Sequence, residues 1–222
     1  MCSIPSIPDR KLSLFEPAKD YRNAGYVYHV DKFPTTSVWG LYANGYLKAV
    51  NELIETVLTG KFPGDTFGYP IFFLFSHYLE LRFKEIIQIG RPLIGEKPGF
   101  SKSHNLTTLW GDCNKIFKEV YEWKELSDLD KEGREIFLTM DHFIKELSQD
   151  SKAQTFRYPV DKNGQPLIKD SIMFLNIENM AIVVNWLSQT LDGLCTGVYE
   201  NKRLMDEYHA ELRAEYDEDY WR

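Results

Sequence analysis

Histidine, cysteine and acidic side chains are the residues of this chain that could bind a metal ion or transfer a proton. A zinc site needs three or four such ligands, commonly two of them at short helical spacing. The histidines are far apart in sequence, and so are the cysteines: His29, His77, His104, His142 and His209, and Cys2, Cys113 and Cys195. Widely spaced cysteines, odd in number, predict free thiols in a reducing compartment. Gly-rich phosphate loops, a nucleophile elbow and a zinc-protease helix are missing, so we expect no cofactor and no metal.

A polar strip follows one face of the segment from about residue 70 to 89. It holds His77, Glu80, Lys84 and Gln88, at steps of three or four residues that bring helical side chains together. The strip could line a cleft and bind a ligand. The sequence favours the other interpretation, a solvated face with a Glu80–Lys84 ion pair. If His104 adjoins the strip, His77, Glu80 and His104 could instead form a metal site inside a helical bundle.

Two further groups are candidates for ligand contact. Arg82 lies near the strip, although an arginine between Glu80 and Glu85 is more commonly a structural ion-pair partner. A later polar loop, residues 156–168, reads FRYPVDKNGQPLI and contains Arg157, Tyr158 and Lys162. A planar guanidinium beside an aromatic ring suits a nucleotide phosphate and base. The alternative is that Arg157 pairs with an acidic neighbour and Tyr158 packs on the bundle.

The elements that must position these residues are long amphipathic helices, so we expect an all-α antiparallel bundle. Apolar residues recur at helical spacing over about 40–58, 70–89, from 105 onward, after residue 130 and from 172 onward. The second segment is apolar over the widest surface and is predicted to lie at the centre. Asn105 is the expected cap of the third helix. Ser127 and Asp130 have the spacing of a reciprocal cap for the fourth.

The chain divides into three predicted parts. Residues 1–39 mix prolines with aromatics and indicate an irregular arm packed on the core, within which YVYHV resembles a short edge strand. Residues 40–195 form the bundle, with Cys113 as a small core residue. Gly193 and Gly197 weaken the last helix, and residues 196–222 form a helical extension. Asn163-Gly164 predicts a tight turn in the polar loop.

Composition limits the function classes. The 222 residues carry a formal net charge of −7, so generic DNA binding is not expected. The first residues have no apolar signal core and the richest apolar run, 69–75, is too short to cross a bilayer. We therefore expect a soluble cytoplasmic protein that does not enter a membrane.

Three phrases in this order resemble the HEPN (higher eukaryotes and prokaryotes nucleotide-binding) family of helical bundles. They are YLELRFKEII in the second helix, SHNLTTL at the start of the third, and FRYP before the last long helix. The resemblance covers about Gly40 to Leu194. In the second phrase, His104, Asn105 and Leu106 match the family's histidine, helix cap and leucine. Family members occur in prokaryotic defence and toxin–antitoxin systems.

Active members of this family resemble metal-independent endoribonucleases that bring an Arg and a His together at a dimer interface. The resemblance implies that the histidine activates the ribose 2′-hydroxyl and that the arginine stabilises the phosphate charge. Only RLMDEYH has the family's spacing, with Arg203 and His209 as catalytic candidates. Three nearby carboxylates would repel a phosphate, on Asp206, Glu207 and Glu211. We therefore favour a non-catalytic homodimeric module that binds nucleotide, RNA or a protein partner, with the endoribonuclease and a metal-binding bundle as alternatives.

Overall fold

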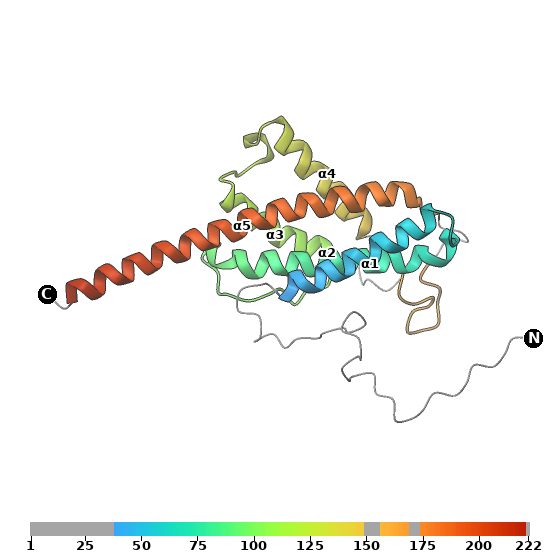
Figure 1. Cartoon of the computed structure of the whole chain (residues 1–222), viewed down its shortest axis with the longest axis horizontal. Coiled ribbons are helices and arrows are strands. Elements are labelled where there is room, and N and C mark those ends of the chain that lie inside the picture. The colour runs from blue at the N-terminus through green and yellow to red at the C-terminus, as the bar shows by residue number, and fades with distance from the viewer. Residues whose placement is uncertain (1–37, 149–155, 169–173, 221–222) are drawn as a thin grey trace, which may run out of the picture. The chain divides into compact units, whose positions relative to one another are not determined.

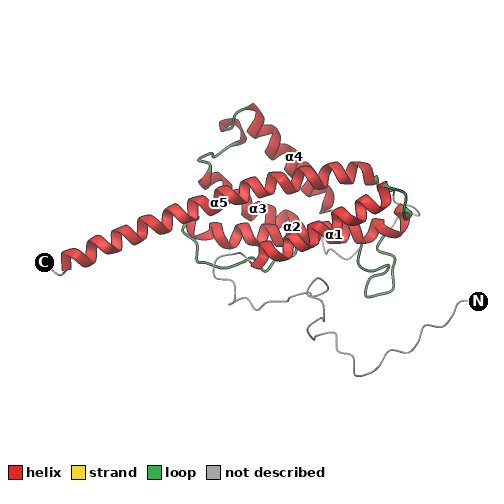
Figure 2. Ribbon diagram, viewed as in Figure 1, coloured by secondary structure: helices red, strands yellow, loops and turns green. Residues whose placement is uncertain are grey.

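The computed structural model describes residues 38–148, 156–168 and 174–220, with side chains described up to residue 215. By its internal contacts the chain divides into two units, Met1–Thr35 and Thr36–Arg222, and every described residue belongs to the second. Over this part the structure consists of α-helices, short 3-10 turns and one isolated β-bridge (Figure 2). The predicted all-α fold is confirmed. The predicted arm and its edge strand lie outside the described residues, apart from the last two residues of the arm, which begin the first helix.

The second helix begins earlier than the sequence predicts. Helix α1 spans Val38–Leu58 and α2 spans Gly64–Gly90, so Pro70 lies inside α2 instead of starting it. A proline inside a helix removes one backbone hydrogen bond and crowds the preceding turn. The helix continues through the proline, and Gly68 before it and Ile71 after it are both buried.

The third and fourth helices begin at side-chain caps. In α3 (Leu106–Val120), the Asn105 side chain accepts a hydrogen bond from the Thr108 amide at 2.9 Å, as predicted. In α4 (Lys131–Leu147), Asp130 accepts one from the Gly133 amide at 2.7 Å. The predicted reciprocal cap between Ser127 and Asp130 is wrong. The reciprocal pair is Glu125 with Asp128, because a 3-10 turn, η4 (Leu126–Asp128), precedes α4.

The last helix, α5, is the longest and runs unbroken over Ile177–Tyr220 (Figure 1). It begins after the predicted residue 172, and Asn176 caps it by accepting a hydrogen bond from the Asn179 amide at 2.9 Å. Gly197 does not interrupt it. A Cβ at that position would lie 2.2 Å from the Tyr121 hydroxyl, so glycine permits close approach of α3. The predicted C-terminal extension is therefore the end of α5.

Helix α2 lies at the centre of the core, as predicted, and packs against α1, α3 and α5 (Figure 1). Its aromatic residues Phe75, Tyr78 and Phe83 are fully buried. Cys113 on α3 is also fully buried, as expected for a core residue, and its thiol lies 3.6 Å from the Phe83 carbonyl oxygen. None of the described helices combines the length and the apolar composition that a membrane span requires.

Candidate ligand-binding pocket

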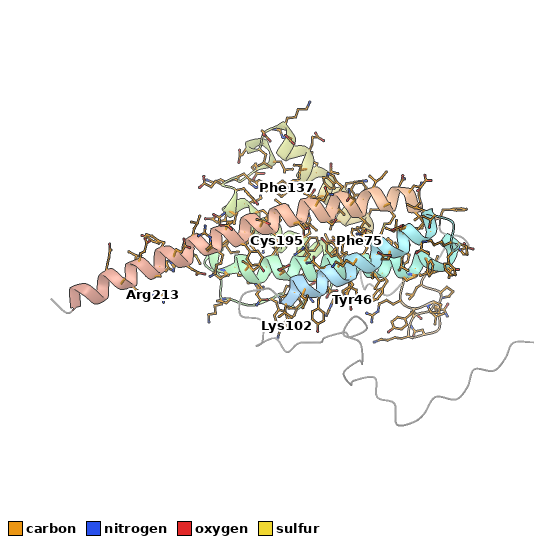
Figure 3. All side chains as sticks on the ribbon, viewed as in Figure 1. Tyr46, Phe75, Lys102, Phe137, Cys195 and Arg213 are labelled. Atoms are coloured by element: carbon orange, nitrogen blue, oxygen red, sulfur yellow. The ribbon has the colours of Figure 1, made fainter. Side chains whose placement is uncertain are left out.

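A pocket of about 310 Å³ opens beside the middle of α2, toward α1, the start of α3, the end of α4 and the beginning of the polar loop. This volume is at the small end of the range for small-molecule sites. Tyr46 lines it from α1 (Figure 3). The pocket is lined by aromatic, polar and charged side chains: Tyr46, Phe72, Phe73, Ser76, His77, Glu80, His104, Leu106, Leu147, Ser148, Phe156 and Arg157.

Glu80 is the buried acidic group of this pocket. Its carboxylate accepts hydrogen bonds from Lys84 Nζ at 2.8 Å and from His104 Nδ1 at 2.9 Å, and His77 Nδ1 lies 3.9 Å away. Glu80 and Lys84 are 8% and 5% exposed. The predicted Glu80–Lys84 pair is thus confirmed, but the solvated face that it was expected to lie on is wrong. Only Gln88, the last member of the strip, is exposed.

The surroundings of Glu80 keep it ionised. Burial alone would raise the pKa of its carboxyl, but the neighbouring His77, Lys84 and His104 outweigh burial and lower the pKa to about 2. The Glu80 and Lys84 charges offset each other at neutral pH. Among the described residues that line the pocket, the other fixed charge is the guanidinium of Arg157.

The two histidines of the pocket differ in their neighbours and in their exposure. The His77 ring is held between aromatic rings, edge-on to Tyr46 at 4.5 Å and parallel to Phe73 at 6.1 Å between centroids. The His104 side chain is 74% exposed and is anchored through Nδ1 by Glu80. Its Nε2 therefore remains available to a ligand. His104 comes directly before the cap of α3, so the helix start determines its position.

Arg157 is positioned at the pocket by the aromatic side chain of its neighbour Phe156. Phe156 stacks on Phe72 of α2 with 3.8 Å between centroids. The Arg157 guanidinium then lies 5.2 Å from the Phe73 ring centroid and 5.6 Å from that of Tyr158. No described carboxylate pairs with Arg157, so the expected acidic neighbour is not found in the described part of the chain. The N–H groups of this guanidinium are available for an anion.

Ser76 is a pocket residue that the sequence did not single out. Its Oγ is buried and has no hydrogen-bond partner among the described residues. A buried hydroxyl without a partner is costly, and most such groups are satisfied by protein, water or ligand. Its position directly before His77, on the strip that faces the pocket, was the one sequence signal that could have identified it.

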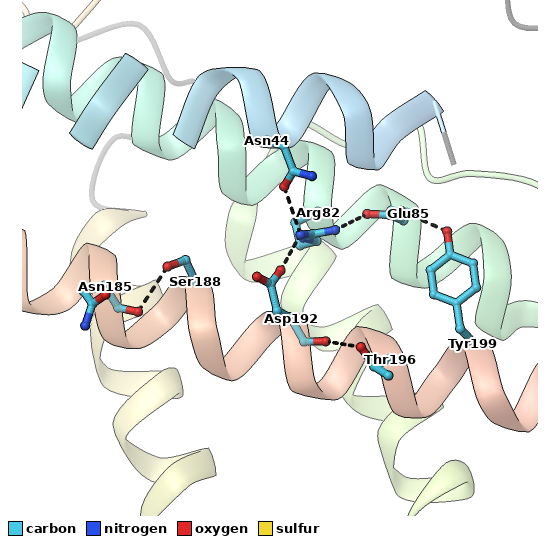
Figure 4. A network of polar contacts seen from close by, with 8 residues as sticks. All are labelled: Asn44, Arg82, Glu85, Asn185, Ser188, Asp192, Thr196 and Tyr199. Carbon is cyan, nitrogen blue, oxygen red and sulfur yellow. Dashed lines mark hydrogen bonds and ion pairs between the residues drawn. The ribbon is translucent and has the colours of Figure 1, made fainter. Parts of the chain in front are cut away.

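Arg82 does not line the pocket and belongs to a separate buried network (Figure 4). Its guanidinium donates to Glu85 at 2.7 Å on the same helix and to Asp192 on α5, and it lies 3.4 Å from the Asn44 amide oxygen on α1. The Tyr199 hydroxyl donates to Glu85 at 3.0 Å. The ion-pair role that the sequence favoured for Arg82 is confirmed, and the network joins three helices.

The other loop candidates lie outside the pocket. Tyr158 is 52% exposed, and its ring centroid lies 5.6 Å from the Arg157 guanidinium. Lys162 is exposed in the predicted turn, where Gly164 has a φ of 76° and an antiparallel bridge joins Val160 to Pro166. The structure therefore brings together His77, Glu80, His104 and Arg157, and it leaves Arg82 and Lys162 elsewhere.

Arg203 and His209 lie on the exposed end of α5. The Arg203 guanidinium is engaged by two carboxylates, Glu200 at 3.0 Å and Glu207 at 2.7 Å. Residues six positions apart differ by about 120° around a helix, so within one chain the two side chains leave different faces. Their catalytic role remains a prediction.

The described residues contain no group of three or more His, Cys, Asp or Glu side chains placed to hold a metal ion. In the pocket, Glu80 Oε1 already accepts from Lys84 and His104, and a lysine ammonium repels a metal cation. Comparisons of the chain with protein-family models, curated proteins and solved structures found no match.

Proposed function

We propose that this chain is a non-catalytic, HEPN-like binding module whose pocket holds a single nucleotide, either free or at the end of an RNA. The base would lie among the aromatic side chains, and the phosphate would lie between Arg157 and His104. The observation that carries the proposal is the Arg157 guanidinium, which has no carboxylate partner among the described residues and is held over an aromatic ring at the wall of the pocket.

The size and lining of the pocket support a nucleotide. A volume of about 310 Å³ suits one small ligand and is too small for a folded polymer. Aromatic rings bind bases by stacking, which is worth about 1–3 kcal/mol per base. Tyr46 and Phe73 supply such rings at the pocket wall. The Ser76 hydroxyl supplies a buried hydrogen-bonding group for a polar edge of the ligand.

The charges of the pocket support a phosphate. Arginine binds phosphate through two parallel hydrogen bonds, and these are roughly twice as strong as hydrogen bonds between neutral groups. The negative charge of Glu80 is offset by the neighbouring Lys84 ammonium, which donates together with His104 to one carboxylate oxygen, Oε1. The Arg157 guanidinium favours an anion over a neutral ligand. Because His104 Nδ1 donates to Glu80, its Nε2 accepts a hydrogen bond in the neutral ring and donates one to a phosphate in the imidazolium form.

Binding is favoured over catalysis because of the surroundings of Arg203. That guanidinium is bound by Glu200 and Glu207, so it would have to leave two carboxylates before it could stabilise a phosphate. These exposed ion pairs are weak individually, but they also place negative charge where the substrate would lie.

Titration calorimetry with nucleoside monophosphates tests the proposal. The matched ligands are the corresponding nucleosides and inorganic phosphate, which separate the base contribution from the phosphate contribution. We expect the monophosphate to bind more tightly than either part. Arg157→Ala should weaken the monophosphate about 10-fold to 100-fold, the effect of losing a hydrogen bond to a charged group, and should leave nucleoside binding nearly unchanged.

The control variant is Arg213→Ala, because Arg213 is an exposed arginine on α5 that donates to the His209 carbonyl oxygen, away from the pocket. It removes the same charge and should leave binding unchanged. Absence of binding by every nucleoside monophosphate would refute the proposal. Equal weakening by Arg157→Ala and Arg213→Ala would refute the placement of the phosphate, because it would mean that only net charge matters.

A further inference from the structure

The two carboxylate oxygens of Glu80 differ in their surroundings. Lys84 Nζ and His104 Nδ1 both donate to Oε1, at 2.8 Å and 2.9 Å. Oε2 has no hydrogen-bond partner among the described residues, since His77 Nδ1 lies 3.9 Å from it, which is too far for a hydrogen bond. Oε2 is also not one of the unpaired side-chain atoms that are closed off from solvent in this part of the chain. Because Glu80 lines the pocket, Oε2 is open to it.

This oxygen accepts hydrogen bonds and cannot donate them. Although burial raises it, the neighbouring His77, Lys84 and His104 lower the pKa of Glu80 to about 2, so the carboxylate is ionised near neutral pH. A ligand atom that meets Oε2 must therefore carry a hydrogen to donate. A hydroxyl that donates to a carboxylate makes a charge-assisted hydrogen bond, which is roughly twice as strong as one between neutral groups.

The position of Glu80 relative to the phosphate identifies the ligand group. In the proposed function, on which this inference rests, the phosphate lies between Arg157 and His104. The His104 ring then meets the phosphate through Nε2 and Glu80 through Nδ1, so one imidazole ring separates the two anions. In a nucleotide the sugar is attached directly to the phosphate and precedes the base. The ligand hydrogen that reaches Oε2 therefore belongs to a sugar hydroxyl.

A second polar group lies one helical turn before Glu80 on the same face of α2. Ser76 precedes Glu80 by four residues, and helical side chains at this spacing are neighbours. Both residues line the pocket, and Ser76 Oγ is buried without a hydrogen-bond partner among the described residues. A serine hydroxyl both donates and accepts, so it can bind a second hydroxyl of the ligand. A ribose presents two neighbouring hydroxyls of this kind.

We propose that the pocket binds the ribose of a ribonucleotide, with one sugar hydroxyl at Glu80 Oε2 and the other at Ser76 Oγ. A nucleotide that lacks one of these hydroxyls keeps its base and its phosphate but leaves one of the two protein groups without a partner. An unpaired buried polar group is costly, so a site built for a hydroxyl rejects a ligand without it. Glu80 and Ser76 thus select ribonucleotides over deoxyribonucleotides.

Calorimetry with the wild-type chain tests the preference for ribose. The ligands are ribonucleoside 5′-monophosphates and their 2′-deoxy and 3′-deoxy forms. We expect the form that lacks the hydroxyl at Glu80 to bind about 10-fold to 100-fold more weakly, the effect of losing a hydrogen bond to a charged group. The form that lacks the other hydroxyl should bind about 2-fold to 10-fold more weakly, the effect of losing a neutral hydrogen bond.

The outcomes separate this inference from the proposed function. Equal binding of the ribonucleotide and both deoxy forms overturns the inference and leaves the proposed function intact. Absence of binding by every nucleotide refutes the proposed function itself. A preference that follows the amino group of the base, as between adenosine and inosine monophosphates, instead of the sugar hydroxyls also overturns the inference.

Two variants assign the preference to the two residues. Ser76→Ala removes a hydroxyl that has no partner among the described residues, so we expect it to fold as the wild type does and to lose the smaller preference. Glu80→Met is combined with Lys84→Met, because replacing both partners by apolar side chains leaves no unpaired buried charge. This double variant should bind the ribonucleotide as weakly as the deoxy form that lacks the hydroxyl at Glu80.

The quantity compared within each chain is the ratio of ribonucleotide affinity to deoxynucleotide affinity. A general change of the pocket, such as loss of the bond that anchors His104, affects both affinities and cancels in this ratio. Glu52→Gln is the matched control, since Glu52 is an exposed glutamate on α1 that does not line the pocket, and it should leave both ratios unchanged. Ratios that stay at the wild-type values in Ser76→Ala and in the double variant overturn the roles of Ser76 and Glu80.

Discussion

Replacing Glu80 by glutamine removes the negative charge of the pocket while it keeps the shape of the side chain. In the wild-type chain this carboxylate offsets Lys84, which is only 5% exposed. Glutamine can still accept a hydrogen bond from Lys84, but the buried ammonium then has no counter-charge. Removal of one partner from a buried ion pair is strongly destabilising for this reason.

The pKa of Glu80 gives the magnitude. It is lowered from the ordinary value of 4.5 to about 2, and each tenfold change in the protonation equilibrium corresponds to about 1.4 kcal/mol, so ionised Glu80 stabilises the fold by roughly 3 kcal/mol. Because the folded-state pKa is below the unfolded one, this stabilisation is fully present above about pH 4.5. It is lost as the pH falls toward 2.

The difference in unfolding free energy between wild type and Glu80→Gln is therefore expected to depend on pH. It should be roughly 3 kcal/mol near pH 7 and shrink to about 1 kcal/mol near pH 3, where the wild-type carboxylate becomes protonated in the unfolded chain. Urea unfolding followed by far-ultraviolet circular dichroism measures both values. Taking the difference between the two unfolding free energies at each pH removes the contributions of the other acidic groups, which both chains share.

Glu52→Gln is the matched control, since Glu52 is an exposed glutamate on α1. Its effect should stay within about 0.5 kcal/mol at every pH. If Glu80→Gln is as stable as wild type near pH 7, Glu80 does not hold the charges of the pocket together. If the loss is the same near pH 3 as near pH 7, its cause is packing instead of charge.

Three further outcomes follow from the described contacts. Arg82→Met should lower the free energy of unfolding in urea by about 3–5 kcal/mol, because it leaves the buried Glu85 carboxylate without its partner. A decrease below about 1 kcal/mol would contradict a stabilising role of the Arg82 network. Gly90→Ala should destabilise by about 1–3 kcal/mol, because its Cβ would lie 2.3 Å from an isoleucine of α3. By contrast, Gly111→Ala should raise the melting temperature, because a Cβ at this position in the middle of α3 would have no neighbour within 4 Å and alanine favours the helix. Equal effects of the two substitutions would contradict the close packing at Gly90. Metal-free incubation with labelled RNA should leave it intact, and cleavage that His209→Ala abolishes would restore the endoribonuclease interpretation.

The sequence was sufficient for features that depend on neighbours along the chain. The cap at Asn105 and the Glu80–Lys84 pair follow from spacings of three and four residues, and both were predicted. The central position of α2 also followed, because few other arrangements bury so wide an apolar surface. The fold class needed no information beyond this periodicity.

Features that depend on distant residues could not be predicted in the same way. His104 follows Glu80 by 24 positions, and the path of the chain through the 3-10 turn η3 (Arg91–Ile94) decides whether they meet. The sequence left this meeting as one option and favoured a solvated strip. The role of Gly197 was misinterpreted for a related reason. It was interpreted as weakening the helix, whereas its missing side chain accommodates Tyr121, the residue that follows α3.

The unbroken course of α5 ties its outer end to the protein interior. Asp192 is bonded to Arg82 near the middle of this helix, and the helix has no hinge between that contact and its outer end. Because the helix is continuous between these points, a displacement of its outer end would also move Asp192 relative to Arg82, and it would thereby couple a contact at that end to the packing of α1, α2 and α5.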